Sequence, residues 1–162
     1  MRSFLYLFIL LILVWLMLTL NFTKQEIIAG SCVSILLSIL LYKYYKELNL
    51  PKLSIKKIIY IIIYIVILFK EIIKANFDVA YRVIHPKMPI KPGIVIIKTN
   101  LKSDIGKLVL ANSITLTPGT FTLDIKDDVL LIHWINVKTD KIEDATEIIG
   151  KRFEKYLKVI FE

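Results

Sequence analysis

A run of 21 residues without a charge, Ser3 to Thr23, restricts what the start of this chain can fold into. As an α-helix the run would be about 31 Å long, roughly the thickness of the hydrocarbon core of a bilayer. A second uncharged run of 16 residues, Ile27 to Tyr42, follows after a link too short for anything but a turn. Because 56% of the residues are apolar, the sequence predicts a membrane protein that begins with a helical hairpin, residues 1–45.

The alternative interpretation of the first run is a cleaved signal peptide, with Arg2 as its basic start. The run is longer than the apolar core of a typical signal, lacks a small-residue cleavage site, and is followed at once by the second run. We therefore expect both runs to stay in the membrane.

The segment after the second run is strongly basic. Residues 43–57 contain a single acid, Glu47, and five lysines, at positions 43, 46, 52, 56 and 57. Basic loops stay on the cytoplasmic side, so both ends of the hairpin are expected there, in a multi-pass protein of the cell membrane. Residues 84–162 carry twelve basic and ten acidic groups. This near balance argues against nucleic-acid binding, which needs a concentrated basic face.

Small residues recur at every fourth position of the second run, at Gly30, Ser34 and Ser38. Such a stripe allows helices to pack closely in lipid, and random use of small residues is the alternative. The single cysteine, Cys32, excludes an intrachain disulfide and a thiolate metal site, and we expect it to be a small buried residue.

Residues 46–92 are expected to form the basic loop, one long helix from Ser54 to Ile84, and a proline-rich linker that ends near Gly93. The first half of the helix is apolar all round, whereas charged residues recur every four positions from Lys70 to Arg82. The pattern indicates an amphipathic helix that lies at the membrane interface or packs in a bundle. A tilted third span is the alternative, and it would move the C-terminal region across the membrane.

Residues 93–162 predict a small cytoplasmic α+β domain of order βαββα. Strands are expected at 93–99, 121–125 and 129–137, and a first helix at 103–113. Its core face should carry Ile105, Leu108, Val109 and Asn112. Asp140 and Glu143 predict a capping box for the last helix. The core face of that helix should contain Ile142, Ile149, Phe153, Tyr156, Leu157 and Ile160.

The sequence TPGT, at Thr117, Pro118, Gly119 and Thr120, separates the first domain helix from the second strand. Pro followed by Gly fits a type II turn, in which Gly takes a positive φ. A phosphate loop would need more glycines, a lysine and a helix that begins at the loop. Because a strand follows instead, we interpret TPGT as a structural corner.

No set of residues in the chain predicts catalysis. His133 lies in an expected strand without a Ser or Cys partner in any nucleophile motif, and His85 precedes Pro86 in the linker. The hairpin has no ionisable residue inside its two apolar runs, so the chain is not a complete transporter. We expect no catalytic residue, no metal and no cofactor.

Four short motifs are distinctive: KANFDV (Lys74 to Val79), PKMPIKPG (Pro86 to Gly93), ITLTPGT (Ile114 to Thr120) and IHWI (Ile132 to Ile135). They resemble those of the E subunits of the multisubunit Mrp-type Na+/H+ antiporters. The resemblance covers nearly the whole chain. It implies a non-catalytic accessory subunit of an antiporter, either stand-alone or as the antiporter module of a ferredoxin-linked membrane-bound hydrogenase or sulfur-reducing complex.

The expected partners are other membrane subunits of such a complex and the lipid bilayer. Asn76 and Asp78 match one motif of this family, and the four TPGT residues match its most distinctive one. Our candidates for subunit contacts are Gly30, Ser34, Ser38, Asn76, Asp78, Thr117, Pro118, Gly119 and Thr120. A free-standing membrane-anchored binding domain is the competing function.

Overall fold

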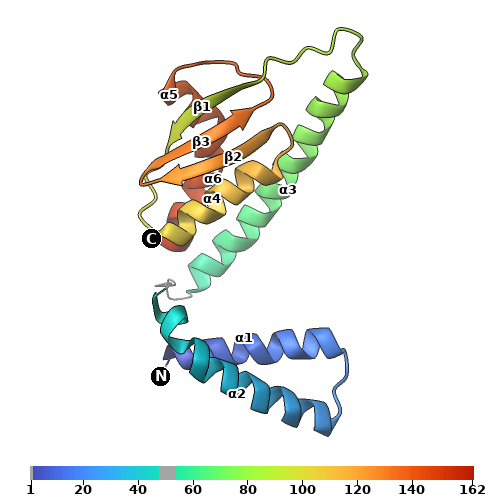
Figure 1. The fold of residues 1–162 in the computed structure, drawn as a ribbon, viewed down its shortest axis with the longest axis vertical. Coiled ribbons are helices and arrows are strands. Elements are labelled where there is room, and N and C mark those ends of the chain that lie inside the picture. The colour runs from blue at the N-terminus through green and yellow to red at the C-terminus, as the bar shows by residue number, and fades with distance from the viewer. Residues whose placement is uncertain (1, 48–53) are drawn as a thin grey trace. The chain divides into compact units, whose positions relative to one another are not determined.

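The computed structural model describes residues 2–47 and 54–162. The chain divides into two compact units, Met1–Leu50 and Pro51–Glu162, each of which is described by itself (Figure 1). The first unit contains two helices, and the second contains a long helix and a small α+β domain. Helices followed by a small α+β domain are therefore confirmed as the fold class.

The first unit is a hairpin of α1 (Arg2–Thr19) and α2 (Lys24–Glu47). α1 is shorter than the uncharged run because Leu20 turns the backbone with a φ of 48°, and Thr23 then accepts a hydrogen bond from the amide of Glu26. Among the described residues, α2 is the helix that is long and apolar enough to cross a membrane, and the apolar part of α1, Phe4–Thr19, is shorter.

The stripe of Gly30, Ser34 and Ser38 is buried inside this hairpin. A Cβ atom added to Gly30 would lie 2.4 Å from Cδ1 of Trp15, so glycine is needed for α1 and α2 to approach this closely. The predicted packing role is confirmed, but the surface that the stripe contacts belongs to α1 of the same chain. The three residues are therefore covered without a second subunit.

Cys32 is exposed on α2, so its predicted burial is wrong. Only the side of α2 that carries the small-residue stripe faces α1, and Cys32 lies away from that stripe. The surrounding surface is almost entirely apolar, with side chains such as Ile28, Leu36 and Ile39 more than half exposed.

The second unit begins with α3 (Ile55–Ile84), a single helix of 30 residues as predicted. Ser54 caps its first turn by accepting a hydrogen bond from the amide of Lys57. Tyr64 is buried near its middle, and Tyr60, Ile61 and Leu68 pack partly buried against the core of the domain.

The domain follows in the predicted order of strands and helices. Its elements are β1 (Gly93–Lys98), α4 (Asp104–Leu116), β2 (Thr120–Lys126), β3 (Val129–Trp134), α5 (Ile142–Ala145), the π-helical turn η1 (Thr146–Gly150) and α6 (Lys151–Phe161). The strands form an antiparallel sheet of order β1-β3-β2 (Figure 1). A two-residue turn in which Asp127 has a φ of 55° joins β2 to β3.

The core lies between the sheet and the helices. Alternate strand residues, among them Ile97, Leu130 and Ile132, are fully buried on one face of the sheet. They meet Leu110 of α4 and Phe153 of α6 in one cluster. The opposite face of the sheet carries Ile94, His133 and Phe121 side by side in the strand register, and it is only partly covered.

Two details of the helices differ from the predictions. Leu108 and Asn112 of α4 are exposed, and the buried side of this helix instead carries Gly106, Leu110, Ala111, Ser113 and Ile114. Small residues are buried there because β2 and α6 both lie close to α4. The capping box of the last helix is also wrong, since Lys141 is the cap position and has no side-chain cap bond. The hydroxyl of Thr139 instead accepts a hydrogen bond from the amide of Lys141, just before the helix begins.

Candidate functional site

The TPGT corner is held by hydrogen bonds within the turn and to the last turn of α4. The hydroxyls of Thr117 and Thr120 both donate to the carbonyl oxygen of Ile114, each at 2.7 Å, and the amide of Thr120 donates to the carbonyl oxygen of Thr117 at 3.3 Å. The last carbonyl oxygens of a helix lack their usual partners, and here the oxygen of Ile114 accepts from the amide of Thr117 as well as from the two hydroxyls. These contacts explain the motif's threonines without any bound ligand.

Gly119 has a φ of 91°, which confirms the positive φ that the Pro-Gly pair predicts. Its carbonyl oxygen accepts from the amide of Ile135 at 2.8 Å, so the corner is attached to the end of β3. An added Cβ would lie 2.9 Å from Cγ2 of Ile135 and 3.5 Å from Cγ2 of Val79. Both the backbone conformation and the close approach of Ile135 therefore favour glycine, whereas Val79 of α3 would be in ordinary contact.

Arg82 links the end of α3 to the proline-rich linker. Its Nε and Nη2 donate to the carboxylate of Asp78 at 2.8 and 3.0 Å, and its Nη1 donates to the carbonyl oxygen of Pro89 at 2.6 Å. With its amide oxygen turned towards Arg82, Asn136 accepts at 3.1 and 3.2 Å. The hydrogen bond from Arg82 lowers the pKa of Asp78. The linker also pairs with the chain beyond β3, through Lys91 and Asn136.

The four motifs therefore converge in one place, although they are far apart in the sequence. We call this place the motif cluster and define it as Asp78, Val79, Arg82, Pro89, Gly119, Ile135 and Asn136. It ties α3, the linker, the TPGT corner and the end of β3 together. Its interactions hold backbone segments in place, and it contains no nucleophile paired with a base.

Asn76 and Phe77 lie on the other side of α3 from this cluster and are exposed. Together with Ile73 and Ala80 they line a shallow hollow on the helix. The side-chain amide of Asn76 donates to the carbonyl oxygen of Ile72 at 2.8 Å. Of the two candidate contact residues on α3, Asn76 is thus exposed without a partner from another of the described elements, and Asp78 is engaged by Arg82.

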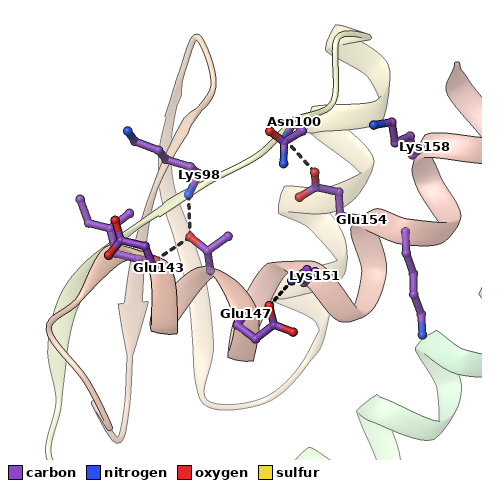
Figure 2. Close-up of a pocket in the computed structure, with 10 residues that line it drawn as sticks. Lys98, Asn100, Glu143, Glu147, Lys151, Glu154 and Lys158 are labelled. Atoms are coloured by element: carbon purple, nitrogen blue, oxygen red, sulfur yellow. Dashed lines mark hydrogen bonds and ion pairs between the residues drawn. The ribbon is translucent and has the colours of Figure 1, made fainter.

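A larger cavity, of about 500 Å³, lies at the Lys98 end of β1, the end away from the motif cluster (Figure 2). Its charged residues are Lys98, Glu143, Glu147, Lys151, Glu154, Lys155 and Lys158. Two of its carboxylates already have partners, because Glu154 accepts from the amide of Asn100 at 2.7 Å and Glu147 pairs with Lys151. With four lysines and three carboxylates that do not converge, the cavity offers neither an anion site nor an acid–base pair.

The sequence analysis did not identify several residues that have structural roles. Arg82 lies four residues after Asp78, a spacing that favours an ion pair on a helix and could have identified it. Glu71 of α3 pairs with Arg152 of α6 at 2.7 Å, and Tyr64 pairs with Ser113 of α4. These long-range pairs have no local pattern. In the described part of the chain, no group of three or more His, Cys, Asp or Glu residues is arranged to hold a metal ion.

The fold and the motif cluster define a class of protein: a helical hairpin with an apolar surface, followed by a long helix and a small α+β domain whose motifs meet in one cluster. A family model described as "Na+/H+ ion antiporter subunit" matches residues 8–160. The E1 subunit of the Na+/H+ antiporter of Staphylococcus aureus is 36% identical over 151 residues, which is 91% of each chain. The chain belongs to this family of antiporter subunits.

Two solved structures are also similar. A chain of the membrane-bound sulfane sulfur reductase, an archaeal respiratory membrane complex, shares 48% identity, covers 99% of this chain and has a TM-score of 0.88. A chain of the Mrp complex from Dietzia sp. covers 63% of this chain at 24% identity, and its TM-score of 0.45 is too low for a structural argument. The protein is a subunit of an Mrp-type antiporter module, with other membrane subunits as partners.

Proposed function

We propose that this chain is a non-catalytic assembly subunit that anchors a cytoplasmic docking domain beside the ion-translocating subunits. The hairpin crosses the membrane with both of its ends on the cytoplasmic side, in accordance with the lysines of the segment that follows α2. The domain then lies in the cytoplasm and contacts neighbouring subunits.

The observation that carries this proposal is the motif cluster. The motifs that resemble those of the antiporter family converge on one corner, where Arg82 bonds to the carboxylate of Asp78, the side chain of Asn136 and the backbone oxygen of Pro89. A reactive centre would instead need a nucleophile, a base and a site for a substrate between them. Fixed geometry with no reactive set fits recognition by another protein.

The contact that we assign to the domain is made by Pro118 of the TPGT corner. Pro118 is only partly covered, whereas Thr117 is buried and serves the corner from inside. A neighbouring subunit would meet a preformed turn, which loses little conformational entropy on binding.

The assembly that we favour is a redox-linked membrane complex with an antiporter module. The support is the similarity to the sulfane sulfur reductase chain, at 48% identity over 99% of this chain, against 36% for the antiporter subunit of Staphylococcus aureus. The experiment is purification from the native membrane in mild detergent through a tag after Glu162, with identification of the co-purifying chains by mass.

Recovery of antiporter-type subunits together with iron–sulfur subunits would support the redox-linked complex. Antiporter-type subunits alone would indicate a stand-alone cation/proton exchanger and overturn that assignment. Recovery of the chain by itself would contradict the assembly role and favour a free-standing anchored binding domain.

A further inference from the structure

One side of α3 is fixed against the domain by two long-range pairs. Glu71 accepts from Arg152 of α6, and the hydroxyl of Tyr64 contacts that of Ser113 on α4. Tyr64 is also buried beside Phe153, with the two rings edge to face at 6.5 Å between centroids. These contacts set the rotation of α3 about its axis, so the opposite side of the helix faces away from the domain.

That opposite side is apolar from one end of the helix to the other. We call it the outer stripe of α3, and its nine residues recur at helical spacing: Ile55, Ile59, Ile62, Val66, Phe69, Ile73, Phe77, Ala80 and Ile84. All nine are exposed, and Ile55 and Ile84 at its two ends are 80% and 81% exposed. A stripe of this length, about 45 Å, is far larger than the scattered apolar residues of a soluble surface.

The charges that border the outer stripe are basic. Lys56, Lys70 and Lys74 lie along one edge of it, are exposed, and form none of the ion pairs found among the described residues. The two acids of α3 are both paired, Glu71 with Arg152 of α6 and Asp78 with Arg82 of α3 itself. The free charge on the outward side of the helix therefore complements an anionic surface.

The outer stripe differs from the surface by which α2 meets α1. Helices that pack against each other in lipid use small residues at the contact, as α2 does with Gly30, Ser34 and Ser38. The outer stripe has one small residue, Ala80, and its other members are aliphatic or aromatic. Bulky aliphatic side chains beside lysines are typical of a helix that lies in the plane of a membrane surface.

We infer that the outer stripe of α3 binds the surface of an anionic lipid bilayer, with its apolar side chains among the acyl chains and its lysines at the headgroups. The inference rests on the proposed membrane location of the hairpin. α3 begins only eight positions after the last residue of α2, Glu47. A connection this short keeps the start of α3 near the membrane that holds the hairpin. The helix then supports the docking domain at the bilayer surface.

The test measures what surrounds a nitroxide label on the full chain. In a Cys32→Ser background, one variant carries Ile62→Cys on the outer stripe and a control carries Ile94→Cys on the outer face of the sheet. The two isoleucines are 58% and 61% exposed, so they are matched in type and in accessibility. Each protein is placed in nanodiscs of phosphatidylcholine with phosphatidylglycerol, alone and in its complex, and collisions with oxygen and with a polar nickel chelate are compared.

We expect a severalfold higher ratio of oxygen to nickel collisions at position 62 than at position 94, because oxygen concentrates in lipid. Access of both reagents to position 62 would mean that the stripe faces water and would overturn the inference. Exclusion of both reagents in the complex would show that a protein subunit covers the stripe, which also overturns it.

The anionic part of the inference has its own control. Replacement of Lys56, Lys70 and Lys74 by Gln should reduce the ratio at position 62 in nanodiscs with phosphatidylglycerol and leave it unchanged in phosphatidylcholine alone. An equal ratio before and after replacement would contradict the headgroup contact. Because the label is read on the lone chain as well as in the complex, failure here is distinguishable from failure of the chain to assemble.

Discussion

The N-terminal hairpin and the C-terminal domain place polar and apolar side chains in opposite ways. In the hairpin, Ser34 and Ser38 are buried, whereas Leu18 and Ile28 are 79% and 64% exposed. In the domain, Phe153 and Leu157 are fully buried and the lysines of α6 are exposed. This contrast is the one expected for a hairpin in lipid and a domain in water, because apolar surface gains nothing by leaving a lipid environment.

The α3 helix combines both arrangements. Its inner side, around Tyr64, belongs to the hydrophobic core of the domain. Its outer stripe is exposed and apolar, like the surface of the hairpin. If the outer stripe binds lipid as inferred, this helix lies where lipid and water meet. The following substitutions test this contrast, beginning with the largest expected effect.

The same substitution in the two regions should have very different effects. Leu157→Ala removes a fully buried side chain of the domain core and should lower the free energy of unfolding by about 2–5 kcal/mol. Leu18→Ala, at a position 79% exposed on the hairpin, should stay within about 0.5 kcal/mol in mild detergent. Thermal unfolding followed by circular dichroism measures both, and equal losses would remove the contrast.

Gly30→Val tests whether the hairpin depends on close packing. The new side chain would overlap the indole of Trp15, and overpacking of this kind should cost up to about 3 kcal/mol. Ala29→Val, at the exposed neighbouring position, is the matched control and should have little effect. Resistance of the chain to SDS titration compares the two. If both variants behave alike, α1 and α2 are not held by this contact.

Gly119→Ala tests the TPGT corner of the domain. A side chain at a φ of 91° and 2.9 Å from Ile135 should cost about 1–2 kcal/mol of stability and reduce the yield of the complex. Gly150→Ala is the control, because its added Cβ would meet only Cδ1 of Ile97 at 3.4 Å. Normal yield of the Gly119→Ala complex would show that assembly does not depend on the corner.

Glu71→Gln tests the ion pair that fixes α3 to the domain. The two side chains are 16% and 31% exposed, and burial is the main cause that lowers the pKa of the Arg152 guanidinium. Loss of the partner charge should therefore destabilise the domain by about 1 kcal/mol. Glu147→Gln removes an ion pair whose side chains are 63% and 64% exposed, and we expect almost no change. Chemical denaturation of the two variants decides whether burial makes this difference.

The smallest expected effect is on the stability of the fold at acid pH, through the carboxylate of Asp78. Its pKa is lowered from 3.8 in the folded protein, so the ion pair with Arg82 stabilises the fold above that pH and the contribution disappears as pH falls below it. Because the Asp78 side chain is 54% exposed, solvent screening limits the effect to about 0.5 kcal/mol. The free energy of unfolding of Asp78→Asn should therefore depend less on pH in this range than that of the wild type. A steeper profile for the variant would contradict the sign.

The sequence predicted well where a pattern is local. Ser54 and the following apolar run predicted the whole of α3, and the Pro-Gly pair predicted the conformation of Gly119. Prediction failed for Cys32 because it was inferred from the size of the residue, whereas burial in α2 follows the stripe of Gly30, Ser34 and Ser38, and Cys32 lies away from that stripe. It failed for α4 because Gly106 and Ser113 are buried there, and small residues carry no hydrophobic signal.

The candidate contact residues show the same division. Asn76 and Asp78 are two positions apart on α3, yet one faces outward and the other pairs with Arg82. The stripe of Gly30, Ser34 and Ser38 was predicted as a packing surface, but only the hairpin shows that α1 covers it. A spacing indicates that a side is suited to contact, and the partner that makes the contact depends on the rest of the chain.

The sequence by itself determined that this chain has an apolar hairpin, a long amphipathic helix and a βαββα domain, because each depends on the periodicity of side chains a few residues apart. The tertiary structure decided that four distant motifs share one cluster and that the outer stripe of α3 has no partner in its own domain. Those facts depend on which segments meet in space, as with Glu71 and Arg152, and no local pattern records such meetings.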